Sequence, residues 1–230
     1  MVCRRTNDGA LAFENGVTRS SSCRPYMSTA AAVAWFGVLL QCYLSLNLAT
    51  ANGQTIAHGV VIFLGFFTVL TNILVCLALT LPLIVRASPA GKFLSSPVAV
   101  GGIAANIAFV AISYHFLLRN IWNPQGAQLL ADMLLHYVVP ALFVVYWLVY
   151  SRTGSLRWVH PFFWSLYPAA YFIYVLARGE LTGIYPYGFM DVSAIGYRHT
   201  IVNALGLLIG FIVLGSLFVG MDRLGRRAAF

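Results

Sequence analysis

The amino-acid sequence predicts an all-α integral membrane protein, folded as a single bundle of six transmembrane helices with its N- and C-termini in the cytoplasm. Of its 230 residues, 60% are hydrophobic and only 9% are charged, and the mean hydropathy is +0.82. Soluble domains carry about 25% charged residues. The apolar residues gather into several runs of about 20 or more, and about 20 helical residues cross a bilayer. These observations predict one membrane domain and exclude a separate soluble domain.

The expected elements follow the chain in order. Residues 1–26 are polar and rich in Ser and Gly, so we expect a disordered cytoplasmic tail. Six apolar segments follow, and we expect each to span the membrane: 27–48, 56–85, 97–118, 127–150, 161–177 and 193–220. They make up a six-helix transmembrane domain over 27–220, and 221–230 form a basic cytoplasmic tail. The segment 56–85 is longer than a bilayer needs, so this helix should tilt or protrude.

The basic residues predict the orientation. Eleven of the fourteen Lys and Arg lie in the N-terminal tail, in the second and fourth connections and in the C-terminal tail. Cytoplasmic connections of membrane proteins are enriched in Lys and Arg, so both termini are predicted on the cytoplasmic side. The formal charge of +8 does not indicate nucleic-acid binding, because these residues are spread between apolar runs and form no single basic face.

Each expected span carries a polar side chain near the middle of the bilayer. At about 1.5 Å per residue, Thr68 and His136 both lie about 14–18 Å below the outer interface. The other members of this polar layer are Gln41, Asn106, Tyr167 and Asn203. Polar groups are costly to expose to lipid, so we expect all of them to face the bundle interior. There they either form interhelical hydrogen bonds or line a substrate site.

The fourth span carries the strongest indication of a site. Asp132 and His136 are at positions i and i+4, so they share one helix face. Pro140 follows four residues after His136 and has no N–H, so the carbonyl of His136 is expected to lose its helical donor and the helix to kink. Ionisable groups inside a membrane span are functional candidates by default.

Nucleophilic catalysis is the chemistry that suits these residues. A hydroxyl beside an imidazole can act as a nucleophile with its general base, and both Thr68 and Thr71 lie in a suitable turn. Spacing alone does not choose between them. Asp132 is able to orient the imidazole as the acid of a hydrolytic triad does, and Asn72 to donate to a developing oxyanion. The alternative for Asp132 is an ion pair with an arginine near the outer face: Arg119, Arg178 or Arg198.

The spacing of cysteines and histidines predicts no metal site and no cofactor. The four cysteines show no CxxC motif and no Cys/His ligand pattern. A haem-binding electron carrier would need a second histidine at the depth of His136, and His199 is the candidate for it.

Three motifs occur in order along the chain. They are Phe66-Phe67-Thr68 followed by Asn72, then Leu135-His136-Tyr137-Val138-Val139-Pro140, and then Tyr185-Pro186-Tyr187-Gly188-Phe189-Met190-Asp191. In a six-span topology over 27–220, this set resembles the androgen-induced protein family of intramembrane threonine hydrolases, and more closely its bacterial branch. The resemblance implies hydrolysis of fatty acid esters of hydroxy fatty acids in the bacterial cytoplasmic membrane. It implies Thr68, and not Thr71, as the nucleophile and His136 as its histidine; it implies no role for Asn72.

We therefore expect an intramembrane hydrolase whose substrate is a membrane lipid or fatty acyl ester. Thr68 would attack and His136 would act as the general base, supported by Asp132 and Asn72. Tyr187 lies in the outer connection, where its ring either lines an entrance for substrate or anchors the connection at the interface. The alternative function is a transporter of a small molecule or of protons that uses the same polar layer.

Overall fold

The structure, a computed structural model, describes residues 14–151 and 154–227. The described residues form helices and connections and contain no β-strand, which confirms the all-α prediction. Five helices are long and apolar enough to cross a membrane: Ser22–Ala51, Phe67–Ile84, Pro97–Leu118, Gly126–Ser151 and Val192–Leu224. The chain is therefore a multi-helix protein of membrane type.

The helices follow one another with short connections. Their bounds are α1 (Glu14–Ala51), α2 (Ile56–Phe63), α3 (Phe67–Ile84), α4 (Pro89–Leu94), α5 (Pro97–Ser113), η1 (Tyr114–Leu118), α6 (Gly126–Met133), η2 (Leu134–Val138), α7 (Val139–Tyr146), η3 (Trp147–Ser151), α8 (His160–Trp164), α9 (Leu166–Thr182), η4 (Gly188–Met190) and α10 (Val192–Arg227). The first three η segments are π-helical and η4 is a 3₁₀ turn.

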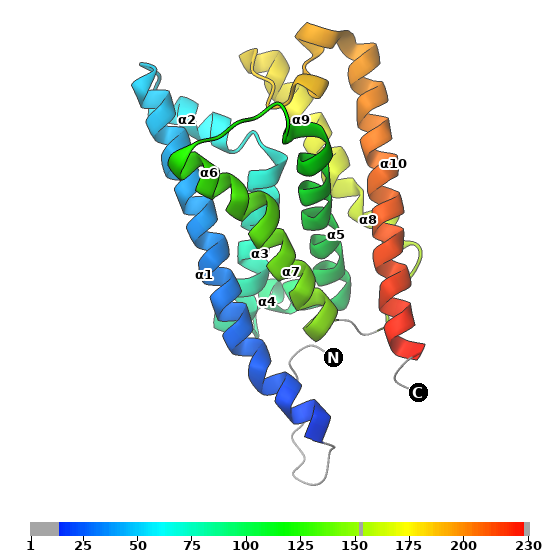
Figure 1. The fold of residues 1–230 in the computed structure, drawn as a ribbon. Helices are drawn as coiled ribbons and strands as arrows, with labels where there is room; N and C mark the ends of the chain where they lie inside the picture. Colours follow the sequence, from blue (N-terminus) through cyan, green and yellow to red (C-terminus); the bar gives the residue numbers. More distant parts are fainter. Residues whose placement is uncertain (1–13, 152–153, 228–230) are drawn as a thin grey trace.

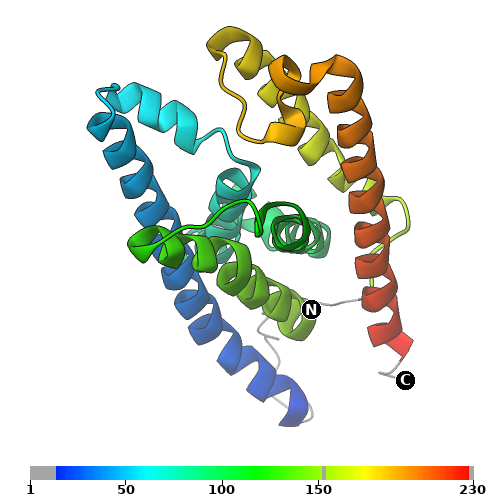
Figure 2. The ribbon, with the colours of Figure 1, turned by 45° about the horizontal axis from the view of Figure 1, so that its top comes forward.

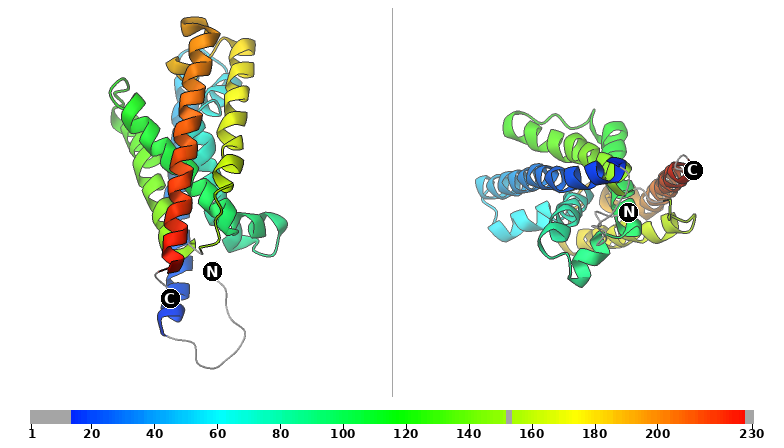
Figure 3. Two further views of the ribbon diagram at one scale, coloured as in Figure 1. Left: turned by 90° about the vertical axis from the view of Figure 1, so that its right-hand side faces the viewer. Right: turned by 90° about the horizontal axis from the view of Figure 1, so that it is seen from below.

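The long helices form a bundle with α3 and α5 inside it (Figure 1). α3 packs between α1 and α5, α5 also packs on α7, and α10 covers α5 and α8 from the opposite flank (Figure 2). The first turns of α1 and the last turns of α10 lie at the same end of the bundle (Figures 1 and 3). Val75, Leu79, Ile107, Phe143 and Trp147 are fully buried where these helices meet.

The predicted disordered tail is wrong for part of its length. α1 begins at Glu14 and runs without interruption to Ala51, so residues 14–26 are helical; the rest of that tail lies outside the described residues. At about 1.5 Å per residue, these 38 residues extend about 57 Å. At the other end, α10 continues to Arg227, so most of the basic tail is helical as well.

The expected single helix over 56–85 is instead two helices joined by a turn. α2 crosses the end of the bundle at an angle and α3 runs down through its centre (Figure 2). Two tyrosines of α9 supply donors for the Leu64 and Gly65 carbonyls of this turn. Tyr171 donates to the Gly65 carbonyl over 2.8 Å and Tyr174 to the Leu64 carbonyl over 3.3 Å. Buried non-helical backbone is tolerated at membrane depth when neighbouring helices satisfy it in this way.

The later segments also depart from regular helices. The expected span 161–177 divides at Ser165 into the short α8 and the 17-residue α9. α10 is kinked at Gly196, whose φ of 75° and ψ of 158° are accessible to glycine at little cost. α9 and α10 run side by side beyond this kink (Figure 3).

Candidate active site

Thr68 lies in the first turn of α3, directly after the turn that separates α2 from α3. Phe66 is the N-cap residue and makes no side-chain cap bond, and the first helical bond joins the Leu70 N–H to the Phe66 carbonyl. The N–H groups of Phe67, Thr68 and Val69 therefore precede the first intrahelical donor, as at every helix start. Thr68 is only 8% exposed, so its hydroxyl and these N–H groups lie together in a site of low polarity.

His136 lies in a π-helical turn, and Pro140 explains that turn. The Val139 N–H donates to the carbonyl of Leu134, five residues earlier. In the same register the carbonyl of Leu135 would take its donor from Pro140, which has no N–H. Leu135, and not His136 as expected from the sequence, is thus the residue whose carbonyl loses its helical donor. π-turns of this kind occur frequently at functional sites.

Asn72 supplies the missing donor. Its Nδ2 atom donates to the Leu135 carbonyl over 3.1 Å and to the Thr68 carbonyl over 2.8 Å. The side chain is completely buried, and both N–H groups of its amide are used. Asn72 therefore holds α3 and η2 together beside Thr68 and His136. The expectation that its amide donates to an oxyanion is wrong, because that amide already has its acceptors.

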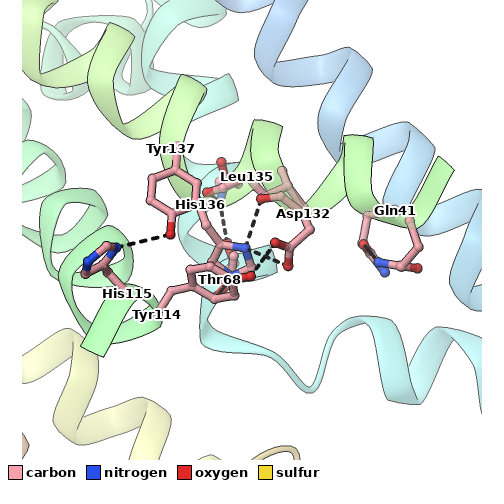
Figure 4. Close-up of polar contacts among 10 residues, drawn as sticks. Gln41, Thr68, Tyr114, His115, Asp132, Leu135, His136 and Tyr137 are labelled. Atoms are coloured by element: carbon pink, nitrogen blue, oxygen red, sulfur yellow. Dashed lines mark hydrogen bonds and ion pairs between the residues drawn. The ribbon is translucent and has the colours of Figure 1, made fainter. Parts of the chain in front are cut away.

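Thr68, His136 and Asp132 form a continuous hydrogen-bonded chain (Figure 4). Thr68 Oγ1 lies 3.2 Å from His136 Nε2. His136 Nδ1 lies 3.2 Å from Asp132 Oδ1 and 3.0 Å from the main-chain carbonyl oxygen of Asp132. Both neighbours of Nδ1 are acceptors, so the ring proton lies on Nδ1 and Nε2 keeps its lone pair. Nε2 then accepts from the Thr68 hydroxyl, as a general base does from its nucleophile.

The predicted alternative for Asp132, an ion pair with an arginine, is not what the structure contains. Among the described residues, the ion pair of Asp132 is with His136. Arg119 is exposed and lies near His115, and Arg198 is exposed on α10. Arg178 is buried on α9 and donates through Nη1 to the Ile184 carbonyl over 3.4 Å.

Tyr114 completes the arrangement, and the sequence analysis missed it. Its ring stacks on the imidazole of His136 with centroids 3.8 Å apart and planes 17° apart. Its hydroxyl donates to the second carboxylate oxygen of Asp132. Tyr114 lies four residues before the end of the expected span 97–118. Asp132 lies five residues after the start of the expected span 127–150, so the two side chains lie at a similar depth. A comparison of depths between these two spans would therefore have identified Tyr114.

The hydroxyl of Thr71 is taken up by hydrogen bonds to Phe67 and Tyr167. Its hydroxyl donates to the Phe67 carbonyl over 2.7 Å, the back-bonding typical of threonine in apolar helices. Its oxygen also lies 3.3 Å from the Tyr167 hydroxyl, and the side chain has no exposed surface. Tyr167 thus belongs to the polar layer but contacts Thr71 and not Thr68.

Three other members of the predicted polar layer lie away from Thr68. Gln41 accepts from Gln128 over 2.8 Å and so joins α1 to α6; Figure 4 shows it apart from the imidazole. Asn106 donates to the Gly102 carbonyl of its own helix over 2.9 Å. Asn203 donates to the Phe189 carbonyl over 3.0 Å and so ties α10 to η4. Interhelical or local bonding is therefore their role, and the structure does not place them at the hydroxyl.

A cavity of about 260 Å³ opens beside Thr68. Its wall is mostly apolar and comes from α5, η1, α9, α10 and η4, with Phe109, Phe172 and Leu208 among its lining residues. Ile173 and Leu205 also line it, and they are 67% and 53% exposed, so the cavity reaches the outer surface of the bundle between α9 and α10. An apolar chain fits such a space better than a polar solute.

Tyr187 reaches the same cavity wall from the connection between α9 and α10. Burial raises the pKa of the Tyr187 phenol, while hydrogen bonding with the Thr68 hydroxyl, with the main-chain N–H groups of Thr68 and Phe67 and with Tyr171 acts in the opposite direction. The phenol therefore lies at the start of α3 and stays protonated at neutral pH. The Tyr187 ring lines the cavity together with Thr68.

The described residues offer no obvious ligand set for a metal. Within 14–151 and 154–227, no group of three or more His, Cys, Asp or Glu side chains is placed to hold an ion. His199 is exposed, and its Nδ1 lies 2.9 Å from the Ile195 carbonyl oxygen of its own helix. It does not form a ligand pair with His136, which faces Thr68.

Comparison of the chain with models of protein families, with curated proteins and with solved structures gives no match. What the site does is therefore inferred from its geometry and its chemistry.

Proposed function

We propose that this protein is an intramembrane hydrolase that cleaves a lipid ester through a threonine nucleophile. One observation carries the proposal: the Thr68 hydroxyl lies in the wall of an apolar cavity and is hydrogen-bonded to an imidazole that a buried carboxylate holds from behind. Nucleophile, base and orienting acid are the parts of a hydrolytic triad, which is recognised by geometry and not by fold.

The acylation step uses all three side chains. Thr68 Oγ1 attacks the ester carbonyl carbon as its proton passes to His136 Nε2, and the carbonyl electron pair moves onto oxygen. When the tetrahedral intermediate collapses, the bond to the alcohol breaks and His136 returns the proton to the leaving oxygen. Asp132 stabilises the imidazolium in between, helped by the Tyr114 ring stacked on it. Water, activated by the same imidazole, then hydrolyses the acyl-threonine.

The start of α3 supplies donors for the oxyanion. The N–H groups of Phe67 and Thr68 have no intrahelical acceptor and lie at the positive end of an 18-residue helix. They adjoin the attacking hydroxyl, so an oxygen on the attacked carbon lies near them. Fixed dipoles of this kind, in a buried site of low polarity, are a major source of rate enhancement.

A membrane lipid or fatty acyl ester is the substrate that the cavity supports. Its exposed apolar rim between α9 and α10 would let an acyl chain pass in from the surrounding lipid. The resemblance to the androgen-induced protein family adds a substrate class, fatty acid esters of hydroxy fatty acids. The same resemblance leads us to place the protein in the bacterial cytoplasmic membrane.

We further propose six membrane crossings with both termini cytoplasmic. α8 and α9 together would provide the fifth crossing, because α9 alone has 17 residues. The distribution of Lys and Arg supports this orientation. Cysteine labelling at Ser193 and at Ser95 tests it: the first should react with a membrane-impermeant maleimide from outside, and the second only after the cells are opened.

Transport by the polar layer is the weaker alternative. A proton or solute path needs side chains that face one another, whereas Asn106 bonds within its own helix and Gln41 bonds to Gln128. A transporter would also give flux in proteoliposomes without any covalent adduct at Thr68.

Labelling with an alkyl fluorophosphonate tests the proposed function. The purified protein should be labelled at Thr68 and should hydrolyse p-nitrophenyl laurate in detergent micelles. Thr68→Ala should lose both properties, whereas Thr71→Ala, whose hydroxyl bonds to the main chain, should keep them. Loss of labelling and hydrolysis in Thr71→Ala but not in Thr68→Ala would overturn the proposal.

A further inference from the structure

The phenol of Tyr187 lies beside the position where the oxyanion of the proposed reaction would form. Its ring lines the cavity together with Thr68, and its hydroxyl lies beside the Thr68 hydroxyl and the N–H groups of Thr68 and Phe67. These are the groups that would surround the oxygen of an ester attacked by Thr68. An ester oxygen bound there comes within reach of the Tyr187 O–H.

The Tyr187 ring is held firmly in this place. It stacks on Phe189 with centroids 5.2 Å apart and planes 8° apart, and it packs edge-to-face with Phe66, with centroids 5.8 Å apart. Asn203 fixes the η4 turn by donating to the Phe189 carbonyl. A donor fixed before the reaction needs little reorganisation when charge develops.

The same connection is pinned at its start. Tyr185 packs over Gly179 so closely that a Cβ at Gly179 would lie 2.1 Å from Tyr185 Cε1. Arg178 Nη1 donates to the Ile184 carbonyl. These contacts hold the connection down onto the bundle, so Tyr187 points into the cavity. An aromatic side chain that only anchors a connection at the interface would not need such a location.

We propose that Tyr187 is a catalytic residue of the proposed hydrolase, whose hydroxyl donates a hydrogen bond to the oxyanion formed when Thr68 attacks the ester. The inference rests on the proposed function. In the step itself, the bond from Thr68 Oγ1 to the carbonyl carbon forms, and the threonine proton goes to His136 Nε2. The negative charge moves to the ester oxygen, and Tyr187 keeps its own proton throughout.

The protonation of Tyr187 supports this role. Burial raises the pKa of the Tyr187 phenol, so the phenol remains a hydrogen-bond donor at neutral pH. The phenol O–H adds to the two main-chain N–H groups, and side-chain donors of this type are known to complete oxyanion holes.

The test compares Tyr187→Phe with Tyr167→Phe. Both substitutions remove one hydroxyl from a tyrosine near the start of α3, but the Tyr167 hydroxyl lies 3.3 Å from Thr71 and does not face the cavity. With p-nitrophenyl laurate, Tyr187→Phe should lower kcat about 100-fold with little change in KM. Its affinity for a dodecyl trifluoromethyl ketone, which forms a tetrahedral adduct, should fall by a similar factor. Tyr167→Phe should keep both within about threefold.

These measurements distinguish a failure of the Tyr187 inference from a failure of the proposed hydrolase function. If Tyr187→Phe keeps kcat and ketone affinity within about threefold, or raises kcat because the phenol had blocked the oxyanion position, the inference is wrong while the proposed hydrolase stands. If Thr68→Ala retains full activity, the proposed function itself fails. Should Tyr187→Phe not fold, Asn203→Ala tests the same point, because releasing the Phe189 carbonyl should lower kcat and ketone affinity together and leave KM in place.

Discussion

Replacing Asp132 with asparagine separates two jobs that this residue performs. Its carboxylate carries the negative charge beside the imidazole, and its main-chain carbonyl oxygen, 3.0 Å from His136 Nδ1, also accepts from that nitrogen. The substitution removes the charge and keeps the carbonyl. In hydrolytic triads the equivalent substitution costs about 10⁴ in kcat, because the imidazole takes the wrong tautomer.

In this protein we expect Asp132→Asn to lower kcat by less than it does in those triads. The main-chain carbonyl keeps the proton on Nδ1, and the Tyr114 hydroxyl is able to accept from the new amide as readily as it donates to the carboxylate. The imidazole tautomer therefore survives, and only the stabilisation of the imidazolium by a full charge is lost. We expect kcat to fall about 100-fold, which corresponds to about 2.7 kcal/mol of transition-state free energy.

Hydrolysis of p-nitrophenyl laurate by the purified variants in detergent micelles measures this loss. Glu180→Gln is the matched control, because it makes the same chemical change at an exposed position on α9 and should leave kcat unaltered. A loss near 10⁴ in Asp132→Asn would refute the tautomer argument. A loss under about threefold would show that the carboxylate does not take part in the reaction.

Two further changes test the parts of the fold that position the site. Asn72→Ala leaves the buried Leu135 carbonyl without its donor, so thermal unfolding in detergent should show about 1–3 kcal/mol less stability, and kcat should fall with it; an unchanged unfolding temperature would contradict this. Gly65→Ala would place a Cβ 2.5 Å from Arg178 Nη1, and displacing that buried side chain should cost about 1–3 kcal/mol in the same assay. Gly210→Ala, where nothing lies within 4 Å of the added carbon, is the control; equal stability of the two glycine variants would refute the packing argument.

Much of the candidate site was predictable from the sequence. The pairing of Asp132 with His136 follows from their spacing on one helix turn, and the contact is present at 3.2 Å. Charge-derived topology put Thr68 at the depth of His136, and the two side chains meet. Pro140 predicted an irregular helix, although the π-turn moves the freed carbonyl by one residue to Leu135.

Other features depend on contacts between distant segments. The turn between α2 and α3 has no strong breaker in its sequence, because Leu64, Gly65 and Phe66 read as part of an apolar run. Tyr171 and Tyr174 on α9 stabilise it by satisfying its carbonyls. The hydrophobic periodicity of a segment depends on the residues of that segment alone. It therefore does not indicate hydrogen-bond donors that come from another helix.

By itself, the sequence determined the all-α membrane character, the run of apolar helices and the shared depth of a hydroxyl and an imidazole, because hydropathy, charge placement and helical spacing are local properties. Only the tertiary structure decided that α3 begins at Phe67, which places Thr68 beside N–H groups without an intrahelical acceptor instead of in mid-helix. It also brought Tyr114 onto His136 and the Tyr187 ring into the cavity wall. The physical reason is that helix rotation and breaks are settled by packing and by the satisfaction of buried polar groups, and both require the neighbouring helices to be in place.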